Sequence, residues 1–226
     1  MLQAIIFDFD GLIIDTETPV FEAWSEIYQS HGFRLEPMVW AQCIGRGVDS
    51  VIWSPYDHLE ELLGEPIDRE ALLETKRRRY EELMAGSTIR PGVEHCIQEA
   101  KRLGIKLAVA SSSSHEWVEG HLSKFGLLPH FDCLRCFDDV VKTKPDPELY
   151  LAALAGLEIA SENAIAIEDS PNGVLAAKGA DLYCIAVPNA ITCYLSLEHA
   201  DLQLSSLTEL TLERLPHFTS KIPINA

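Results

Sequence analysis

Two aspartates and a glycine directly follow a short apolar run near the N-terminus. The run, residues 4–7 (Ala-Ile-Ile-Phe), is rich in Ile and Phe and too short for a helix of its own, which predicts a buried strand. Side chains two positions apart on a strand point the same way, so Asp8 and Asp10 would leave its end on one face. Two like charges this close repel unless a cation lies between them or one is protonated. The pattern indicates either a chemical site or a strand cap in which both aspartates accept turn amide hydrogens.

Three further points in the chain place reactive side chains where a predicted strand gives way to a helix. Ser111 follows one such strand, Glu168 and Asp169 follow another, and Lys144 precedes a helix N-terminus in Lys-Thr-Lys-Pro-Asp. A helix N-terminus binds anions readily. Taken singly, the serine could be a cap, the lysine a solvated loop residue and the acid pair a partner of the helix dipole. Their shared position at strand ends favours a joint site.

The sequence Asp-Phe-Asp-Gly-Leu-Ile-Ile-Asp-Thr-Glu, residues 8–17, resembles the first motif of the haloacid dehalogenase superfamily, in its phosphatase and phosphomutase branch. The points at Ser111, Lys144 and Glu168-Asp169 match the family's other motifs in the same order, so the resemblance covers nearly the whole chain. It implies a haloacid dehalogenase-like hydrolase, a phosphoric monoester phosphatase. It also implies an α/β fold: a doubly wound, Rossmann-like parallel sheet of strand order 3-2-1-4-5 with an inserted small α-helical cap domain.

The pattern after residue 91 agrees with such a core. Strands are expected near 105–110, 131–134, 164–167 and 182–187, with helices between them and no hairpin signals. Such alternation predicts a parallel sheet covered by helices on both faces. Strand order reverses beside the first strand, so the ligand crevice is expected where the first and fourth strands end, at Asp8 and Asp169.

Local signals predict several helix starts in this core. Ser113 with Glu116 predicts a capping box, and Asp146 and Ser170, each followed by proline, predict N-caps. The Leu-rich stretch of the tail, residues 202–215, is expected to cover the sheet.

A helical block lies between the first strand and the rest of the core. Its first apolar stripe is Val20, Phe21, Trp24, Ile27 and Tyr28. A block inserted here cannot lie within the sheet, so it forms a separate layer, as the cap does in the resembling family. We therefore expect a core of residues 1–15 and 89–226 and a cap of residues 16–88. The basic run at 76–79 is either a solvated helix face or a substrate contact.

Phosphoryl transfer needs a nucleophile, neutralisation of the phosphate oxygens and a proton source for the leaving alkoxide. Asp8 as a carboxylate can attack phosphorus and form an acyl phosphate. Asp10, one pleat further on, can protonate the leaving oxygen and then deprotonate the attacking water. Several acidic groups around one point favour a hard dication, Mg²⁺. The resemblance implies that Asp8, the backbone carbonyl of Asp10 and Asp169 ligate it, with Glu168 acting through water.

The resemblance also implies how the phosphate is held. Ser111 and the amide of Ser112 would bind it, and Lys144 would neutralise the charge that Asp8 and the phosphate share. The expected catalytic residues are thus Asp8, Asp10, Ser111 and Lys144. From the cap, Arg46, in Cys-Ile-Gly-Arg-Gly, is expected either to contact the substrate or to face solvent.

The sequence therefore predicts a Mg²⁺-dependent phosphatase acting on a small phosphate monoester, a sugar phosphate or similar metabolite, through an aspartyl-phosphate. Dehalogenases of the superfamily lack the second aspartate, so Asp10 favours phosphate esters. One alternative is a β-phosphoglucomutase-like sugar-phosphate mutase. In that pattern a histidine follows the second aspartate by ten residues and an arginine stands three beyond the cap-loop glycine. Here those positions hold Val20 and, counting from Gly45, Val48. The other alternative is an inactive relative that binds a phosphorylated ligand or a partner protein.

The composition and net charge of the chain limit the classes of partner that it is expected to bind. The chain has 226 residues, 47% of them hydrophobic, and a net charge of −17, which repels nucleic acid and anionic membranes. No apolar run approaches the ~20 residues of a membrane span, and Asp8 and Asp10 interrupt the N-terminal apolar stretch, unlike a signal peptide. One CxxC, Cys133 to Cys136, lacks the second ligand pair that zinc needs. We expect a cytoplasmic monomer with a small-molecule substrate, without nucleic-acid or membrane partners.

Overall fold

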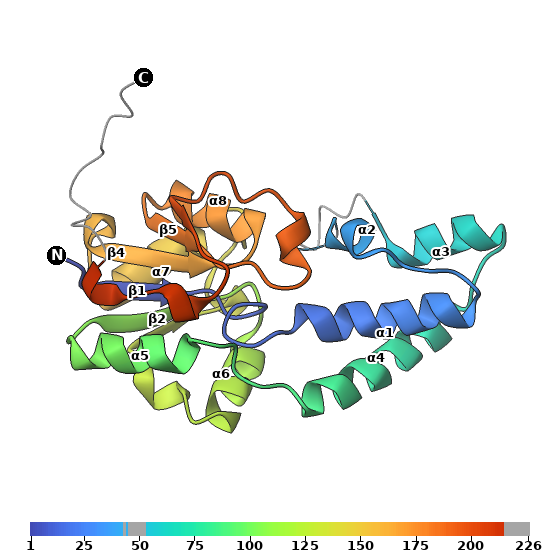
Figure 1. Cartoon of the computed structure of the whole chain (residues 1–226), viewed down its shortest axis with the longest axis horizontal. Coiled ribbons are helices and arrows are strands. Elements are labelled where there is room, and N and C mark those ends of the chain that lie inside the picture. The colour runs from blue at the N-terminus through green and yellow to red at the C-terminus, as the bar shows by residue number, and fades with distance from the viewer. Residues whose placement is uncertain (43, 45–52, 215–226) are drawn as a thin grey trace, which may run out of the picture.

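The computed structural model describes residues 1–42, 44 and 53–214. In these residues eight α-helices and six strands form a sheet-based core with a helical layer beyond one edge of the sheet (Figure 1). The strands are β1 (Ala4–Phe7), β2 (Lys106–Ala110), β3 (Cys133–Arg135), β4 (Ala164–Glu168), β5 (Tyr183–Ala186) and β6 (Leu202–Gln203). The helices are α1 (Glu17–Ser30), α2 (Pro37–Ala41), α3 (Pro55–Leu63), α4 (Arg69–Ala85), α5 (Val93–Arg102), α6 (His115–Lys124), α7 (Glu148–Leu157) and α8 (Pro171–Gly179).

The sheet is entirely parallel, with the strand order β3-β2-β1-β4-β5-β6. The expected order 3-2-1-4-5 is confirmed, and the tail adds β6 beside β5. This sixth strand has two residues, which is too short for a periodic pattern to predict. The expectation that the tail covers the sheet is correct for Leu207, Leu210 and Leu212. They are buried in one of the two apolar clusters that flank the sheet.

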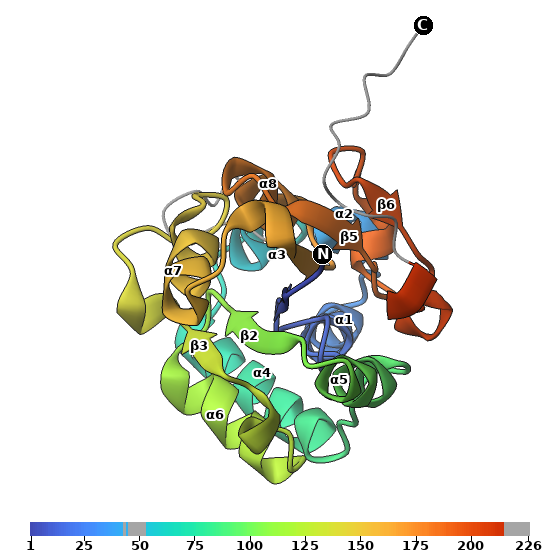
Figure 2. The same ribbon diagram turned by 90° about the vertical axis from the view of Figure 1, so that its left-hand side faces the viewer.

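Helices cover both faces of the sheet because both sets of alternating strand side chains are apolar. Ile5 and Phe7 of β1 pack with residues of α5 and α6. Ala4 and Ile6 point the other way and pack with residues of α7 and α8. Figure 2 shows the sheet passing between these two helix pairs.

The central strands end at the same level. Phe7 of β1 lies opposite Val109 of β2 and Ile167 of β4. Residues that follow these three positions therefore meet at one edge of the sheet, where the strand order reverses.

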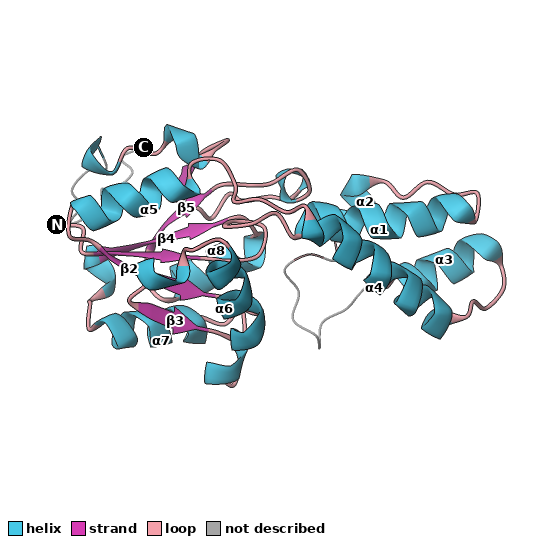
Figure 3. Cartoon of the chain, turned by 90° about the horizontal axis from the view of Figure 1, so that it is seen from below, coloured by secondary structure: helices cyan, strands magenta, loops and turns pink. Residues whose placement is uncertain are grey.

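Helices α1 to α4 form a layer separate from the sheet, as Figure 3 shows. They have their own apolar cluster, which includes Trp24, Tyr28, Trp40 and Leu59, and α1 packs along α4. Among the described residues no helix is both long and apolar enough to cross a membrane.

Of the three local cap predictions, the one at Ser170 holds, the one at Asp146 is wrong by one residue, and the one at Ser113 is wrong. Ser170 caps α8 by accepting a hydrogen bond from the amide of Gly173, as expected. Asp146 accepts from the amide of Glu148 in the first turn of α7, although the N-cap position itself is Pro147. The predicted capping box at Ser113 is wrong, because Ser114 is the N-cap of α6. The Ser113 hydroxyl is instead directed at Asp10.

We predict that Gly92→Ala destabilises the fold strongly. Gly92 caps α5 at φ +91°, and a Cβ there would lie 2.4 Å from the Thr208 amide nitrogen and 2.5 Å from the Leu207 carbonyl carbon. Both are backbone atoms of the tail segment, so the tail must shift. A positive φ costs a non-glycine residue about 1–2 kcal/mol, and overpacking adds roughly 1–3 kcal/mol.

Gly104→Ala is the matched control, since Gly104 has φ +72° and nothing within 4 Å of a Cβ. Urea unfolding should show only the loss of about 1–2 kcal/mol for Gly104→Ala and a clearly larger loss for Gly92→Ala. Equal losses for both variants would contradict the proposed clash.

Candidate active site

One cavity of about 470 Å³ lies at the edge where the strands end, between the sheet and the cap helices. Most of the residues singled out from the sequence line it: Asp8, Asp10, Ser111, Ser112, Lys144 and Asp169. Glu168 lies at the end of β4, fully buried. Arg46, Gly45 and Val48 lie outside the described residues, so the expectation for Arg46 stays a prediction.

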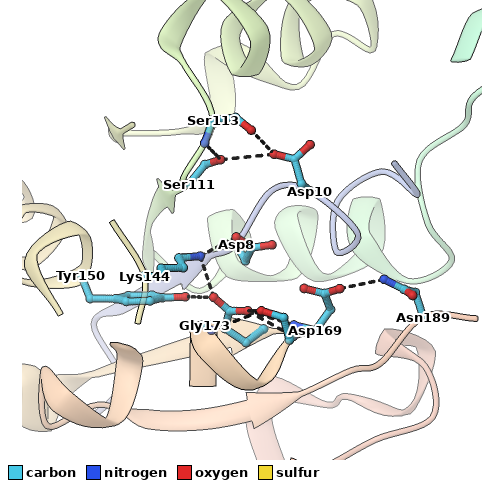
Figure 4. Close-up of polar contacts among 11 residues, drawn as sticks. Asp8, Asp10, Ser111, Ser113, Lys144, Tyr150, Asp169, Gly173 and Asn189 are labelled. Carbon is cyan, nitrogen blue, oxygen red and sulfur yellow. Dashed lines mark hydrogen bonds and ion pairs between the residues drawn. The ribbon is translucent and has the colours of Figure 1, made fainter. Parts of the chain in front are cut away.

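Lys144, which lines this cavity, joins two acids (Figure 4). Its Nζ donates to Asp8 Oδ1 at 2.5 Å and to Glu168 Oε1 at 2.6 Å. All three side chains are almost completely buried, with Glu168 0% exposed. Desolvated charges are tolerated only when they are paired, so the position of each of these groups depends on the other two.

The charges of this group do not balance. Burial lowers the pKa of Lys144, but the charges of Asp8 and Glu168 outweigh that effect and raise it overall, so the lysine is a fixed cation. Burial raises the pKa of Asp8 to about 8; Lys144 works against this rise and Glu168 adds to it. One cation thus faces more carboxylates than it can neutralise.

Glu168 is held in place by a set of donors around its carboxylate. The Tyr150 hydroxyl donates to Oε1 at 2.6 Å, and the Asp169 amide donates to Oε2 at 3.1 Å. The carboxylate also lies against the first turn of α8, where a Cβ on Gly173 would come within 1.9 Å of its carboxyl carbon. A helix N-terminus stabilises a negative charge. Gly173 is therefore needed for Glu168 to occupy this position.

Asp169 is fixed from the other side by Asn189, which follows β5. Asn189 Nδ2 donates to Asp169 Oδ2 at 2.7 Å and to the Gly11 carbonyl oxygen at 3.3 Å. Gly11 has φ +78°, and a Cβ there would lie 2.5 Å from Asp169 Oδ2, so the turn after β1 requires glycine. Burial, with the charges of Asp8 and Glu168, raises the pKa of Asp169 well above its ordinary value.

Three carboxylates could hold a metal ion. Asp8, Glu168 and Asp169 each offer an oxygen within 4.8 Å of the others, the one such group among the described residues. Two observations fit Mg²⁺. All the donors are oxygens, which hard dications prefer. Burial first, and then neighbouring carboxylates, raise the pKa values of Asp8 and Asp169, and a dication beside them would stabilise their charged forms.

Asp10 lies apart from this group and is held by α6 and the loop before it. Ser113 Oγ donates to its Oδ2 at 2.6 Å, and Ser111 Oγ donates to the same oxygen at 3.4 Å. Figure 4 shows these contacts apart from those of Lys144. Trp117 Nε1 donates to its Oδ1 at 2.9 Å. Sequence reasoning missed both Ser113 and Trp117. The run of serines after β2 was a signal, but it was interpreted as a capping box.

The cap side of the cavity mixes apolar and charged groups. It is lined by Glu17 and Val20 of α1, by Ile44, and by Lys76 and Tyr80 of α4. Burial, and then the charges of Asp10 and its acidic neighbours, raise the pKa of Glu17 to about 8. Within the basic run 76–79, Lys76 is the residue that lines the cavity.

Two arginines of that run form ion pairs on the cap surface. Arg77 pairs with Glu81, and Arg79 pairs with Glu26 and Glu82. The alternative of a solvated helix face thus describes these two residues.

Arg90, which the sequence did not single out, ties the site's loops together from the segment that leads back from the cap. Its guanidinium donates to the carbonyl oxygens of Gly11 at 2.5 Å, of Val187 at 3.2 Å and of Pro188 at 2.9 Å. Gly11 belongs to the turn that carries the aspartates and Pro188 directly precedes Asn189, so Arg90 fixes both beside Asp169.

Comparisons with known proteins identify the family of this chain. The family model described as haloacid dehalogenase-like hydrolase matches residues 5–187. The chain is 42% identical over 215 residues to "Putative phosphatase YhcW" of Bacillus subtilis (strain 168), covering 95% of this chain and 96% of that one. It is 30% identical over 217 residues to "Validoxylamine A 7'-phosphate phosphatase" of Streptomyces hygroscopicus subsp. limoneus, covering 96% and 98%.

A solved structure gives the same picture of the fold. The crystal structure of β-phosphoglucomutase (pgmB) from Clostridium difficile superposes with a TM-score of 0.70 at 27% identity, covering 94% of this chain and 95% of that one. The family match over most of the chain, the relatives and the acid-lined cavity at the strand ends lead to one conclusion. This chain belongs to the haloacid dehalogenase-like hydrolases and is an enzyme of their phosphatase branch.

Proposed function

We propose that this protein is a Mg²⁺-dependent phosphatase that hydrolyses a small phosphate monoester, a sugar phosphate or similar metabolite, through an aspartyl-phosphate on Asp8. The observation that carries the proposal is the placement of Asp8, paired with Lys144, and Asp10, with separate donors, along one cavity. A nucleophile and a proton carrier in different environments are what a two-step phosphoryl transfer requires. The relative named validoxylamine A 7'-phosphate phosphatase supports a substrate of this class.

In the first step an oxygen of Asp8 forms a bond to phosphorus while the bond from phosphorus to the ester oxygen breaks. The electron pair of that bond goes to the leaving oxygen, which takes a proton from Asp10. In the second step Asp10 takes a proton from water as the water oxygen bonds to phosphorus. The bond to Asp8 then breaks and its carboxylate is restored.

Lys144 and the serines after β2 hold the charge that moves during these steps. Lys144 Nζ already contacts Asp8 Oδ1, so it can neutralise negative charge shared between that carboxylate and the phosphate. Ser111 and the amide of Ser112 would bind the phosphate oxygens at the start of the loop that leads into α6. The Ser111 oxygen accepts from the Ser113 amide at 3.0 Å, and its hydrogen, now directed at Asp10 Oδ2 over 3.4 Å, can turn to a phosphate oxygen.

Asp8, Asp169 and the backbone carbonyl of Asp10 would hold Mg²⁺, with Glu168 acting through water. When bound, the ion neutralises the negative charge of the phosphate and of the surrounding carboxylates and orients the phosphate. Glu168 is fixed at the end of β4 against the first turn of α8, and Asp169 is fixed by Asn189, so the donor set is prepared for the ion.

The size of the cavity suits a small ester. A volume of about 470 Å³ falls in the range of small-molecule sites. Lys76 provides the one cation on the described cap side of the lining, where it would meet a second polar or anionic group of the substrate. Arg46 remains a proposed substrate contact from the same side.

The residue Val20 counts against the alternative of a sugar-phosphate mutase. This side chain lines the cavity from α1 and has no group that could hold Asp10 through a hydrogen bond. An inactive binder of phosphorylated ligands is disfavoured because Asp8, Asp10 and Lys144 are chemically competent and adjacent to one cavity.

We also keep as proposals the domain limits of 1–15 with 89–226 and 16–88, a monomeric state and a cytoplasmic location.

We expect Asp8→Asn to abolish turnover. Asparagine keeps the shape of the side chain but is a poor nucleophile, and losing a covalent nucleophile lowers kcat by ~10⁴–10⁶. The measurement is phosphate release from a panel of sugar phosphates. Asp15→Asn is the control, since Asp15 accepts from the Thr18 amide and does not line the cavity. If Asp8→Asn retained a tenth of the wild-type activity, the covalent role would be excluded.

We expect activity to require a divalent cation. Without one, Asp8 and Asp169 can be carboxylates beside the phosphate only at a cost, since each close like-charge contact costs about 4 kcal/mol at an effective dielectric of 20. Exhaustive treatment with EDTA should abolish phosphate release, and Mg²⁺ should restore it. Ca²⁺ should restore it poorly, because its coordination is looser. Full activity after chelation would rule out the metal.

Product analysis separates hydrolysis from isomerisation. With glucose 1-phosphate and a trace of glucose 1,6-bisphosphate, we expect inorganic phosphate if that sugar is accepted, because Val20 cannot keep Asp10 from activating water. Glucose 6-phosphate formed faster than phosphate would support the mutase instead.

A further inference from the structure

The two oxygens of Asp10 are held by donors of different kinds. Oδ1 accepts from the indole Nε1 of Trp117 at 2.9 Å. Oδ2 accepts from the hydroxyls of Ser113 at 2.6 Å and Ser111 at 3.4 Å. The proposed function uses Asp10 to carry a proton but does not say which oxygen carries it, or what orients the carboxyl group.

The chemistry of the donors distinguishes the two oxygens. An indole N–H can only donate, whereas a serine hydroxyl rotates and can either donate or accept. A proton on Oδ1 would face the N–H of Trp117 with no acceptor available there. A proton on Oδ2 can be directed at the oxygen of Ser113, whose own hydrogen then turns elsewhere.

Trp117 is well suited to fix a carboxyl group because two other rings pack against its own. The His121 ring, one turn further along α6, lies 4.1 Å from it between centroids. Tyr80 of the cap helix α4 stacks on it at 6.3 Å and 20°. The N-cap residue Ser114 accepts a hydrogen bond from the Trp117 amide at 3.3 Å and anchors the first turn. The indole thus has little freedom to follow Asp10 if the carboxyl group turns.

We propose that Trp117 is a positioning residue for proton transfer. Its N–H fixes Oδ1 of Asp10, so Oδ2 is the oxygen that exchanges the proton. When the ester bond breaks, the Oδ2 proton passes to the leaving oxygen, which receives the electron pair of that bond. In the second step Oδ2 takes a proton from the attacking water. This inference rests on the proposed function, in which Asp10 is the acid and then the base.

The test uses the basicity of the leaving group. Steady-state kinetics of wild type and Trp117→Phe are compared on glucose 6-phosphate, phenyl phosphate and 4-nitrophenyl phosphate. The value of kcat/KM reports on steps up to departure of the leaving group. A sugar alkoxide needs a proton as it leaves, whereas 4-nitrophenolate hardly does. Phenylalanine keeps an aromatic ring at this position and removes the pyrrole ring with its N–H.

We expect kcat/KM of Trp117→Phe to fall about 10–100-fold on glucose 6-phosphate, a part of the 10²–10⁴-fold that general acid catalysis supplies. The fall should be smaller on phenyl phosphate and within about threefold on 4-nitrophenyl phosphate. Because each ratio comes from one protein preparation, loss of folded enzyme cancels. A fall that is equal for the three esters would overturn the inference.

Trp40→Phe is the matched control. The Trp40 indole is buried in the cap cluster, and its N–H has no hydrogen-bond partner in the described part of the chain. The same chemical change there should leave the ratio between the esters unchanged. A changed ratio in Trp40→Phe would show that any Trp→Phe change gives this signature, and it would count against Trp117.

Asp10→Asn separates failure of this inference from failure of the proposed function. If Asp10→Asn itself shows no dependence on the leaving group, the acid role of Asp10 is wrong. If Asp10→Asn shows the dependence and Trp117→Phe does not, only the role of Trp117 is wrong. Because Trp117 acts through Asp10, the double variant should lose no more than Asp10→Asn alone.

A spectroscopic readout needs no turnover. The chain has four tryptophans, so four indole N–H signals are expected in a ¹⁵N-correlated NMR spectrum. The Trp117 signal, assigned by its loss in Trp117→Phe, should move upfield in Asp10→Asn, because a neutral amide accepts a weaker hydrogen bond than a carboxylate. The other three should stay in place, and an unmoved Trp117 signal would contradict the contact.

Discussion

The site depends on one buried ion pair network, in which Lys144 joins Asp8 and Glu168. Buried charges are stable only while each has its partner, and removal of one leaves the others uncompensated. The fold meets this constraint with backbone as well as side chains: Tyr150 binds Glu168, and Gly173 leaves space for its carboxylate at the start of α8. Asp8 is thus positioned by Lys144, which is in turn held by Glu168 and by groups outside the cavity lining. The proposed dication would complement the negative charge that remains there.

The two motif aspartates are two residues apart, yet they belong to different environments. Asp8 is part of the desolvated network with Lys144, while Asp10 contacts only uncharged donors from the loop and helix after β2. Because the two contact different elements, a change at one need not disturb the other. A strand end followed by a glycine turn allows this separation, since Gly11 bends the chain where a Cβ would meet Asp169.

Sequence reasoning located the residues that terminate strands and, through a family motif, Lys144, but it failed on the other residues that reach the site from elsewhere. Asp8, Ser111 and Asp169 follow apolar runs, and parallel strands bring such positions to one edge. Trp117 and Asn189 could not be identified in this way, because their roles arise from how α6 and the segment after β5 lie against that edge. The strand order came from the family resemblance, and the strand β6 carried no periodic signal. Ser113 was misassigned because a cap and a side-chain donor have the same sequence pattern.

The cap shows how helix periodicity limits what a basic run can do. Lys76 and Tyr80 are four residues apart and therefore share the face of α4 that meets the cavity. Arg77 falls on another face and pairs with Glu81, and Arg79 pairs with Glu26 of α1. Charges separated by more than a Debye length, about 8 Å at physiological ionic strength, are largely screened. With a net charge of −17, the protein cannot attract a phosphate ester from a distance, so selection among esters must come from contacts made inside the cavity.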